Sequence, residues 1–355
     1  MAGRRIGAAE EANGQDISLA TRAAWLSFIG GHTQGEIAKR LRVSPAKAHR
    51  LIALAQKRGL VKVFIEGAPA ECMALEDALT KTFGLDHCVV APELEPGAAG
   101  DWRGEFAAVA AAGARFLHHL LQASAPIVVG VGKGRTLAAT VERMPSLGRP
   151  DLKFVSVSGS LTRNLAANPF DVVQRLVEKT GGEGYFLPVP YLAGSVAEKQ
   201  VLQAQDSVQR LLSLARGAEL FVIGLGAMDE NAHVKQTGMV TPAEWRELRE
   251  LGAVGDLMGS FLDIHGRPVA SPVNRLSVGL SLDQLRGRRV VVLAGGAHKA
   301  AAMLAALGTG VITDLILDEP AARRLIGLAG RRTAAPSQGV RCKDASAGRA
   351  AQIGR

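Results

Sequence analysis

The spacing of apolar residues changes along this chain and divides it into two parts. Between residues 19 and 58 apolar side chains recur every three or four positions, which predicts short amphipathic helices. From Leu85 onward, short β-branched runs alternate with helical stretches instead. The chain has 355 residues, of which 47% are apolar, so it can bury a substantial core and two domains are expected.

The first part centres on residues 33–58, where the pattern predicts a helix-turn-helix. Thr33 and Glu36 have the spacing of a capping box, and Ser44 followed by Pro45 predicts the start of the second helix. The positions expected to be buried lie on one face of each helix: Ile37, Ala38 and Leu41 in the first, and Ala48, Leu51, Ile52 and Ala55 in the second. A supporting helix over Leu19 to Ile29 is expected to bury Ala23, Leu26 and Ile29, and the alternating run at 60–65 predicts a small wing.

In a helix-turn-helix, the exposed N-terminal side of the second helix reaches base edges in the major groove. The residues predicted to contact DNA are Thr33, Gln34, Ser44, Ala46, Lys47, His49 and Arg50. A plain helical hairpin without DNA-binding activity would show the same pattern, so the spacing alone leaves both readings open.

Charge favours DNA binding over the plain hairpin. Residues 1–64 contain eleven Lys and Arg against four Asp and Glu, and residues 331–355 contain six against one. The whole chain carries +9, so the part between these segments has a small negative charge. Basicity confined to the ends is expected when one small module contacts phosphates and a larger one does not.

The predicted domain boundaries follow from these shifts in pattern and composition. We expect a disordered N-terminus at 1–18, a DNA-binding domain at 19–66, a linker helix within 67–84, an α/β domain at 85–328 and a disordered basic tail at 329–355. The helix within 67–84 has Met73, Leu75, Leu79 and Phe83 as its apolar positions. It could join the two domains, pair with a second copy or pack on its own domain.

The second part predicts a doubly wound, mostly parallel α/β sheet, because buried apolar strands alternate with helices. The expected strands are His87–Ala91, 127–131, 154–157, 219–223, 290–294 and 311–317. The expected helices between them include 106–122, 169–180, 197–215 and 242–251. In such sheets ligands bind beyond the carboxyl ends of the strands, and four of these strands are followed by glycines.

The turn after the strand at 127–131 has the composition of a phosphate-binding loop. Its glycines allow backbone N–H groups to turn toward one point at the start of a helix, and its side chains add two cations and a hydroxyl. The loop residues are Gly132, Lys133, Gly134, Arg135 and Thr136. A glycine-rich turn also serves tight packing alone, and this one matches neither the dinucleotide fingerprint nor a Walker loop.

A second glycine pair, Gly295 and Gly296, precedes His298 and Lys299 at another strand end. Two such loops in one sheet suit a ligand with anionic groups or many hydroxyls, although a lysine at a helix start is often only solvated. Carboxylates that could bind hydroxyls follow in Asp229, Glu230 and Asp256, and each could instead be a surface charge.

Several classes of protein are disfavoured by composition. The three cysteines, Cys72, Cys88 and Cys342, are scattered and form no metal-binding or disulfide pattern, so a reducing cytoplasm is expected and no metal or cofactor is predicted. No run approaches the roughly 18 apolar residues of a membrane span. Aromatic residues make up 4% of the chain, which argues against binding of single strands by base stacking.

The order of motifs resembles the SorC/DeoR family of bacterial sugar-responsive transcriptional regulators. The resemblance covers roughly residues 19–328 and rests on the helix-turn-helix and five later motifs. They are GVGKGRTL at 130–137, NPFDVVQRLVEKTGG at 168–182, GLGAMDENAHVKQTGMVTPAEW at 224–245, GAVGDLMGSFLDIHGRPV at 252–269 and AGGAHKAAAMLAAL at 294–307. The segments TRAAWLSFIGGHTQ and VSPAKAHRLI most closely resemble the corresponding sequences in repressors of erythritol and related polyol catabolism.

The resemblance implies a winged helix-turn-helix joined to an effector domain related to phosphosugar isomerases and assembled as a tetramer. It implies binding of double-stranded operator DNA and of a sugar, a polyol or a sugar phosphate. By position, Asn168 and Ser158 correspond to polar effector contacts, Asp256 to a hydroxyl-binding acid and Lys299 to a phosphate-binding lysine.

Two departures from the family pattern favour a monophosphate or a free polyol over a bisphosphate. Ser158 stands where some members carry Arg or Lys, and Asn274-Arg275-Leu276 replaces the more usual Asn-Asp-Arg. Lys133, at a position where an aromatic residue or glycine is more common, adds a positive charge that compensates for these departures.

The resulting hypothesis is a cytoplasmic, effector-controlled transcriptional regulator, a repressor of a sugar or polyol operon, with no catalytic residues. The alternative is an isomerase-like sugar-phosphate enzyme with an accessory helical module, for which Asp229, Glu230 and His233 would supply acid–base chemistry. A third reading is a constitutive DNA binder whose effector site has decayed.

Overall fold

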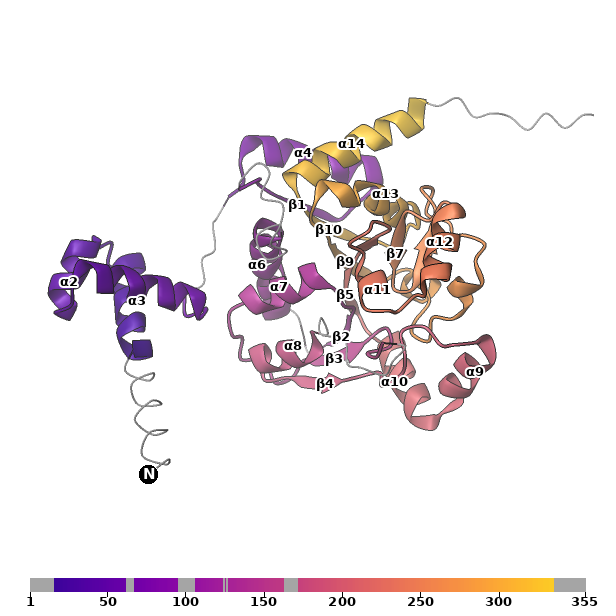
Figure 1. The fold of residues 1–355 in the computed structure, drawn as a ribbon, viewed down its shortest axis with the longest axis horizontal. Helices are drawn as coiled ribbons and strands as arrows, with labels where there is room; N and C mark the ends of the chain where they lie inside the picture. The colour runs from indigo at the N-terminus through magenta and orange to yellow at the C-terminus, as the bar shows by residue number, and fades with distance from the viewer. Residues whose placement is uncertain are drawn as a thin grey trace, which may run out of the picture.

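The structure is a computed structural model that describes residues 16–61, 67–94, 106–123, 125, 127–162 and 172–334, with side chains to residue 331. It contains an N-terminal helical module and a larger α/β domain (Figure 1). The expected wing at 60–65 falls largely on residues 62–66, outside the described residues. No helix in the described ranges is long and apolar enough to cross a bilayer.

The N-terminal module is a three-helix unit. Residues 16–24 are α-helical and continue into a π-helix, η1 (Trp25–Ile29), which is followed by α2 (Gln34–Leu41) and α3 (Pro45–Lys57). Both predicted caps form: Thr33 and Glu36 make a capping box on α2, and the Ser44 hydroxyl accepts a hydrogen bond from the N–H of Lys47 on α3. Arg42 makes the turn in the left-handed region, with φ 54°. The buried face contains Ile37, Ala38, Ala48, Leu51 and Ala55, as predicted.

One predicted core position in this module is wrong. Ile29 was expected inward, but 72% of its surface is exposed, whereas Ala23 is fully buried. The π-helical turn explains the difference, because it contains more residues per turn than an α-helix and rotates every later side chain away from the predicted face. Residues 16–18 are helical, so the expected disorder at 1–18 is wrong for these three residues.

The α/β domain contains a seven-stranded sheet in the order β1-β10-β9-β5-β2-β3-β4, with every neighbouring pair parallel. The six predicted strands are β1 (His87–Ala91), β2 (Val128–Val131), β3 (Lys153–Ser156), β5 (Leu220–Gly224), β9 (Arg289–Leu293) and β10 (Asp314–Asp318). The chain runs outward from β2 to β3 and β4 (Glu183–Tyr185), then returns to β5 on the other side of β2. The change of direction between β2 and β5 is the topological switch point at which doubly wound sheets bind ligands.

Helices cover both faces of this sheet, which confirms the doubly wound prediction. One face packs against α6 (Ala107–Ala123), α7 (Arg135–Arg143) and α8 (Val173–Thr180) in one continuous apolar cluster. The other packs against α4 (Ala70–Phe83), α10 (Asp206–Arg216), α13 (Ala300–Gly308) and α14 (Glu319–Ala334) in a second.

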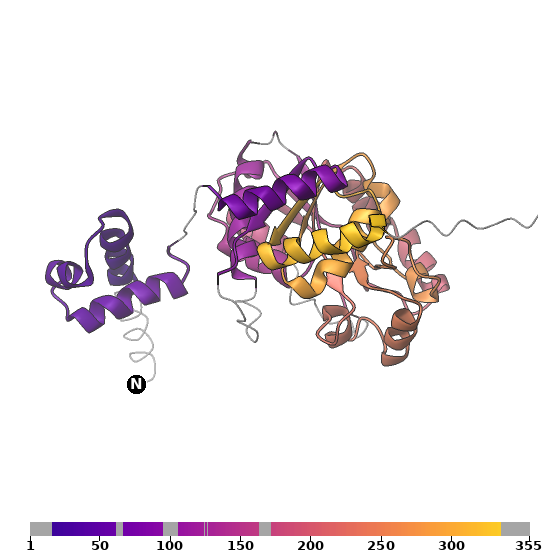
Figure 2. The same cartoon turned by 90° about the horizontal axis from the view of Figure 1, so that it is seen from above.

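The linker helix α4 lies against the sheet domain beside α14 (Figure 2). Its Cys72 and Leu79 are fully buried in the core, and the Glu76 carboxylate accepts a hydrogen bond from the N–H of Val90 in β1 at 2.9 Å. Met73, another of the four apolar positions of this helix, is instead 54% exposed. Of the three alternatives for this helix, the structure shows packing on its own domain.

The structure differs from the predicted elements at further places. The helix expected over 197–215 is divided into α9 (Val196–Ala204) and α10 at Gln205, whose ψ of 131° breaks the helical path. The tail expected to be disordered from 329 is helical to residue 334, because the Ala/Arg-rich segment continues α14. A separate three-stranded sheet, β6 (Gly226–Ala227), β7 (Gly255–Leu257) and β8 (Ser260–Leu262), has strands too short to be recognised by periodicity.

The remaining elements are short. They are α11 (His233–Gln236), α12 (Pro242–Glu250) and three 3-10 turns, η2 (Pro272–Arg275), η3 (Leu282–Leu285) and η4 (Ala297–Lys299). Together with Tyr191, Met239 and Trp245, α11 and α12 form a third apolar cluster beside the carboxyl ends of the strands.

Candidate ligand-binding site

A cavity of about 70 Å³ opens at the carboxyl ends of β2, β3, β5 and β9. It lies at the switch point, where the turn after β2 faces the turn after β5. Its lining includes seven of the nine predicted effector residues: Gly132, Lys133, Gly134, Arg135, Ser158, Asp256 and Lys299. Thr136 follows them at the start of α7, and Asn168 lies outside the described residues.

Two glycines shape this part of the site, one in the turn after β2 and one at the end of β5, which faces that turn. Gly134 has φ 135°, a conformation that other residues rarely adopt, and it caps the start of α7. Across the switch point, a Cβ on Gly224 would lie 2.5 Å from the carbonyl oxygen of Lys133, so the two turns are in direct backbone contact. This contact fixes the loop and leaves the N-terminus of α7 at the cavity.

One end of the cavity is basic. The Arg135 guanidinium and the Lys299 ammonium both lie over the ring of the buried Phe106, at 5.9 and 4.8 Å from its centroid. The turn that carries Lys299 is held by Asp318, whose carboxylate accepts hydrogen bonds from the N–H groups of Gly296 and Ala321. Arg135 follows β2 and Lys299 follows β9, so cations from the ends of two different strands meet at the same ring.

The Thr136 hydroxyl, in the first turn of α7, is buried and has no hydrogen-bond partner among the described residues, although Thr136 itself is not part of the cavity lining. A buried, unsatisfied hydroxyl costs free energy unless something binds it. In the first turn of a helix and next to Arg135 in the chain, an anionic oxygen is a partner that the hydroxyl, the helix N-terminus and the guanidinium would all stabilise.

The cavity lining also contains a buried carboxylate. The short β6–β7 pairing places Asp256 opposite Gly226, and the carboxylate accepts hydrogen bonds from the Tyr191 hydroxyl at 3.1 and 3.0 Å and from the N–H of Gly259 at 2.8 Å. Burial raises the pKa of Asp256, while the positive charge of Lys133 and the two donors act in the opposite direction. Burial and the neighbouring carboxylate likewise raise the pKa of Tyr191 well above its usual value.

Lys133 lies against Tyr191, and its charge acts on Asp256. Its Nζ lies 3.0 Å from the centroid of the Tyr191 ring and 3.1 Å from the Sδ of Met239. The sequence suggested that Lys133 is a phosphate donor in the glycine-rich turn, and that role stays a prediction. The observed position places the ammonium against an aromatic face and a thioether, both in the third apolar cluster.

His233 and Asp229 lie at the cavity, but Glu230 does not. Asp229 faces His298 at 3.7 Å, and His233 is among the lining residues. Glu230 instead pairs on the surface with Lys235 and with Arg249, at 2.9 Å from the latter. The candidate acid–base residues of the enzyme reading are therefore divided between the cavity and the exterior.

The pKa of His233 is lowered to about 4, first by burial and then by the charges of Lys133 and Arg135. The unfolded chain binds this proton near pH 6.5, so stability falls as the pH drops from about 6.5 to about 4, by at most about 3 kcal/mol. We expect His233→Gln to flatten the pH dependence of the free energy of unfolding in this interval, measured by urea denaturation. The exposed His265→Gln is the control, and an equal flattening by both would contradict the assignment.

Tyr191 was not predicted as a site residue. It lies in an irregular loop 65 residues from Asp256, and only the folded chain brings the two together. The one available signal was a tyrosine among apolar residues in the segment PVPYLAGS, which is also typical of core packing. Asn274, noted for its departure from the family pattern, has a structural role: its amide bonds the backbone of Phe261 and Val269.

The predicted DNA-contacting residues gather at the starts of α2 and α3. Gln34 and His49 are within hydrogen-bond distance, at 3.1 Å between Nε2 and Nδ1, which connects the two helices. Thr33 and Ser44 cap the helices, and Lys47 and Arg50 follow on α3, with Arg50 exposed. Their contacts with DNA stay predictions.

Comparison with known proteins gives a consistent result over most of the chain. The profile of the sugar-binding domain family matches residues 68–327. The chain is 41% identical over 312 residues to the erythritol catabolism regulatory protein EryD of Brucella abortus (strain 2308), covering 88% of this chain and 97% of that protein. A domain of a possible sugar-binding transcriptional regulator from Arthrobacter aurescens TC1 is 27% identical, with a TM-score of 0.65 over 74% of this chain and 100% of that chain. The full-length sorbitol operon regulator SorC from Klebsiella pneumoniae shares the fold at 21% identity, with a TM-score of 0.64 over 88% of this chain and 99% of that chain.

Proposed function

The chain belongs to the sugar-binding domain family of SorC/DeoR-type transcriptional regulators, and from this premise we propose that it is a repressor whose effector is a phosphorylated sugar or polyol. The N-terminal helix-turn-helix binds operator DNA, and the cavity at the switch point binds the effector. The regulator assembles as a homotetramer in the cytoplasm, and two-fold pairs of helix-turn-helix modules bind operator half-sites. Ligand binding changes operator affinity through the spacing of these pairs.

The observation that carries the choice of a phosphorylated ligand is the buried Thr136 hydroxyl. It lacks a partner among the described residues and lies in the first turn of α7, directly after Arg135, which lines the cavity together with Lys299. An uncharged ligand would satisfy the hydroxyl but would bring no charge complementary to the two cations in the cavity lining, Arg135 and Lys299. A single phosphate supplies both, because it offers several strong acceptor oxygens and a negative charge.

We expect Lys299→Ala to weaken phosphorylated effectors by about 100-fold, since a buried charge-assisted contact is worth about 2–3 kcal/mol. Titration calorimetry with a ligand selected from a thermal-shift panel of sugar and polyol phosphates measures this change. Lys153→Ala is the matched control, because Lys153 lies at the opposite, amino-terminal end of β3.

The outcomes of this experiment separate the alternatives. Equal loss of affinity in both lysine variants would contradict the proposed phosphate site. Stabilisation by free polyols alone, unchanged in Lys299→Ala, would show that the ligand carries no phosphate there. Operator binding should survive both substitutions, because neither lies in the N-terminal module.

The DNA-binding module gives a separate prediction. We expect Arg50→Ala to reduce discrimination at one operator base pair by about 1–3 kcal/mol, because Arg50 is exposed on α3 where a recognition helix meets base edges. Lys39→Ala on α2 should weaken all DNA sequences alike and reduce the salt slope by about one. Fluorescence anisotropy with operator and scrambled duplexes distinguishes the two variants. Equal weakening of binding to both duplexes by Arg50→Ala would contradict a role for Arg50 in base recognition.

We further propose that the cavity binds its ligand without turnover. Acid–base catalysis requires a group with a suitable pKa at the reacting carbon. His233 is neutral at pH 7, but the nearby Glu230 is engaged on the surface with Lys235 and Arg249. Conversion of a phosphosugar by the purified protein, abolished in His233→Gln, would reverse this assignment.

A further inference from the structure

We infer that the cavity at the amino-terminal ends of β1 and β9 is a second binding site, which takes an organic anion: an anionic group carried on an apolar or aromatic body. The proposed effector cavity lies at the carboxyl ends of the strands, and the two cavities share no lining residue. The second site is therefore separate from the proposed function and can be tested without it.

This second cavity has a volume of about 410 Å³ and lies beside the edge strand β1 and the second half of α6. Three elements supply its lining: Val89 from β1, Arg115, Phe116, His119 and Leu120 from α6, and Arg289 from the start of β9. Cavities that bind small ligands typically measure about 300–1,000 Å³. None of the described residues that line this cavity is acidic, so its charged side chains all favour an anion.

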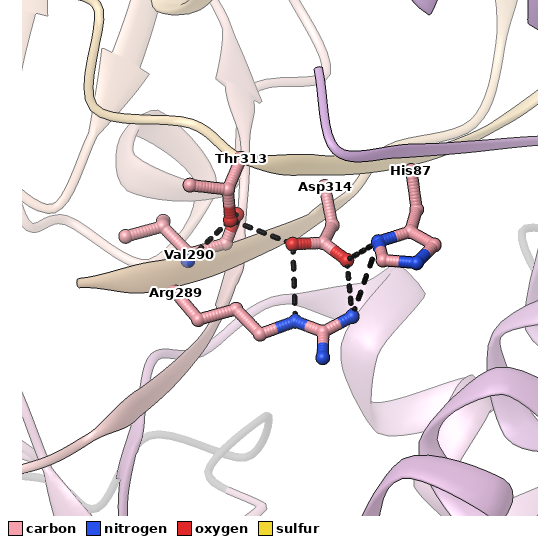
Figure 3. Close-up of polar contacts among 5 residues, drawn as sticks. All are labelled: His87, Arg289, Val290, Thr313 and Asp314. Atoms are coloured by element: carbon pink, nitrogen blue, oxygen red, sulfur yellow. Dashed lines mark hydrogen bonds and ion pairs between the residues drawn. The ribbon is translucent and has the colours of Figure 1, made fainter. Parts of the chain in front are cut away.

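Arg289 supplies a donor whose position is fixed. Its Nε and one terminal nitrogen donate to the Asp314 carboxylate at 3.3 and 2.7 Å, and the same terminal nitrogen lies 3.3 Å from Nδ1 of His87 (Figure 3). The other terminal nitrogen points away from Asp314 and makes no hydrogen bond with the residues that the structure describes. Because the Asp314 side chain is fully buried and holds the guanidinium in place, a ligand loses little entropy in ordering this donor.

Arg115 and His119 add two basic side chains from α6. They are four residues apart, so they lie on the same side of the helix. Arg115 is half-buried and His119 is exposed. A guanidinium binds phosphate or carboxylate oxygens through paired, charge-assisted hydrogen bonds. With Arg289 in the same lining, guanidinium groups from a helix and from a strand border one cavity, and an anion is the ligand that both stabilise.

The rest of the lining is apolar. Val89, Phe116 and Leu120 are half-buried and form the border of the apolar cluster between α6 and the sheet. The centroid of the Phe116 ring lies 5.9 Å from Cζ of Arg289 and 6.1 Å from the centroid of the His87 ring. A ligand that covers this apolar surface removes it from water, which an inorganic ion does not do. The combination therefore favours an anion with an apolar or aromatic body.

Three probes separate the two parts of such a ligand: phenyl phosphate, inorganic phosphate and benzyl alcohol. Affinities are measured by titration calorimetry on the full chain carrying Lys299→Ala, which removes one cation from the effector cavity. We expect phenyl phosphate to bind at least about fivefold more tightly than inorganic phosphate, because its ring covers apolar surface. Benzyl alcohol should bind at least about tenfold more weakly than phenyl phosphate, because it lacks the charge.

Arg115→Gln tests the location of the site in the same background. It should weaken the binding of phenyl phosphate by about tenfold, the value of one charge-assisted contact. Arg210→Gln is the matched control and should leave the affinity unchanged, because Arg210 is exposed on α10, which packs against the other face of the sheet. Far-UV circular dichroism establishes that each variant is folded. If Arg115→Gln does not fold, His119→Ala should weaken the binding of phenyl phosphate by about threefold.

Equal affinity for phenyl phosphate in Arg115→Gln and Arg210→Gln, with no loss in His119→Ala, would overturn the second site. Failure of the Lys299→Ala protein to bind phenyl phosphate at millimolar concentrations would also overturn it. Inorganic phosphate that binds as tightly as phenyl phosphate would contradict the assignment of an organic anion. None of these results bears on the proposed effector site, whose test is the loss of affinity for sugar or polyol phosphates in Lys299→Ala.

Discussion

Replacement of Asp256 by alanine lowers the free energy of unfolding of the α/β domain by about 3–5 kcal/mol. Asp256 is buried and accepts hydrogen bonds from the Tyr191 hydroxyl and the Gly259 N–H. Its removal leaves two buried donors unsatisfied and takes a negative charge from the neighbourhood of Lys133. Each loss costs free energy because a buried donor or charge is left without its partner.

Tyr191→Phe isolates one part of this effect. It removes a single hydrogen-bonding hydroxyl and leaves the carboxylate, so the expected loss is about 1 kcal/mol. The double variant Asp256→Ala/Lys133→Met should recover part of the stability lost in Asp256→Ala, since it also removes the cation. Urea denaturation of wild type, Asp256→Ala, Lys133→Met and the double variant forms a double-mutant cycle. Strict additivity would show that Lys133 and Asp256 do not interact.

Replacement of Arg289 by methionine lowers the free energy of unfolding by about 3 kcal/mol at pH 7. Arg289 begins β9 and donates to the fully buried Asp314 of β10, at 2.7 Å through one nitrogen and 3.3 Å through Nε (Figure 3). Thr313 and His87 also contact this carboxylate, at 2.6 and 3.0 Å. Methionine preserves most of the packing and removes the counter-charge. The loss in the free energy of unfolding therefore measures what it costs to leave the Asp314 carboxylate buried without Arg289.

Arg286→Met is the control for this prediction. Arg286 pairs with Asp283 at 3.0 Å, but 82% of the Asp283 side chain is exposed. An exposed pair contributes little because water solvates both charges equally well when they separate, so the expected change is below about 0.5 kcal/mol. Similar losses in the two variants, measured by urea denaturation, would show that burial of Asp314 is not the cause.

Local features of the N-terminal module were predictable because their causes are local. The capping box joins Thr33 to Glu36 and the second cap joins Ser44 to Lys47, each within one helical turn. Such contacts depend on residue type and spacing alone. The error at Ile29 has the opposite origin: the π-helical turn changes the period, and no residue type in WLSFI predicts that change.

The large sheet was predictable for a related reason. Its strands are buried on both faces, so they read as continuous apolar runs, as in β9, where residues 290–293 are fully buried. The short strand β4 was missed because Glu183–Tyr185 has neither an apolar run nor an alternating pattern. The glycine-rich turns likewise identified the basic end of the cavity, because parallel strands place their carboxyl ends on one edge.

The sequence by itself determined the helix-turn-helix, the parallel α/β sheet and the edge of that sheet where a ligand would bind, since these follow from spacing within one element. Only the tertiary structure decided which residues surround Lys133 in that site. Tyr191 meets Asp256 across 65 residues, and the three-residue strand β7 that places Asp256 exists only through its pairing with β6 and β8. The direction of the Lys133 side chain was decided in the same way. A flexible side chain can point in many directions, and here its conformation depends on contacts with Tyr191 and Met239, which are distant in sequence.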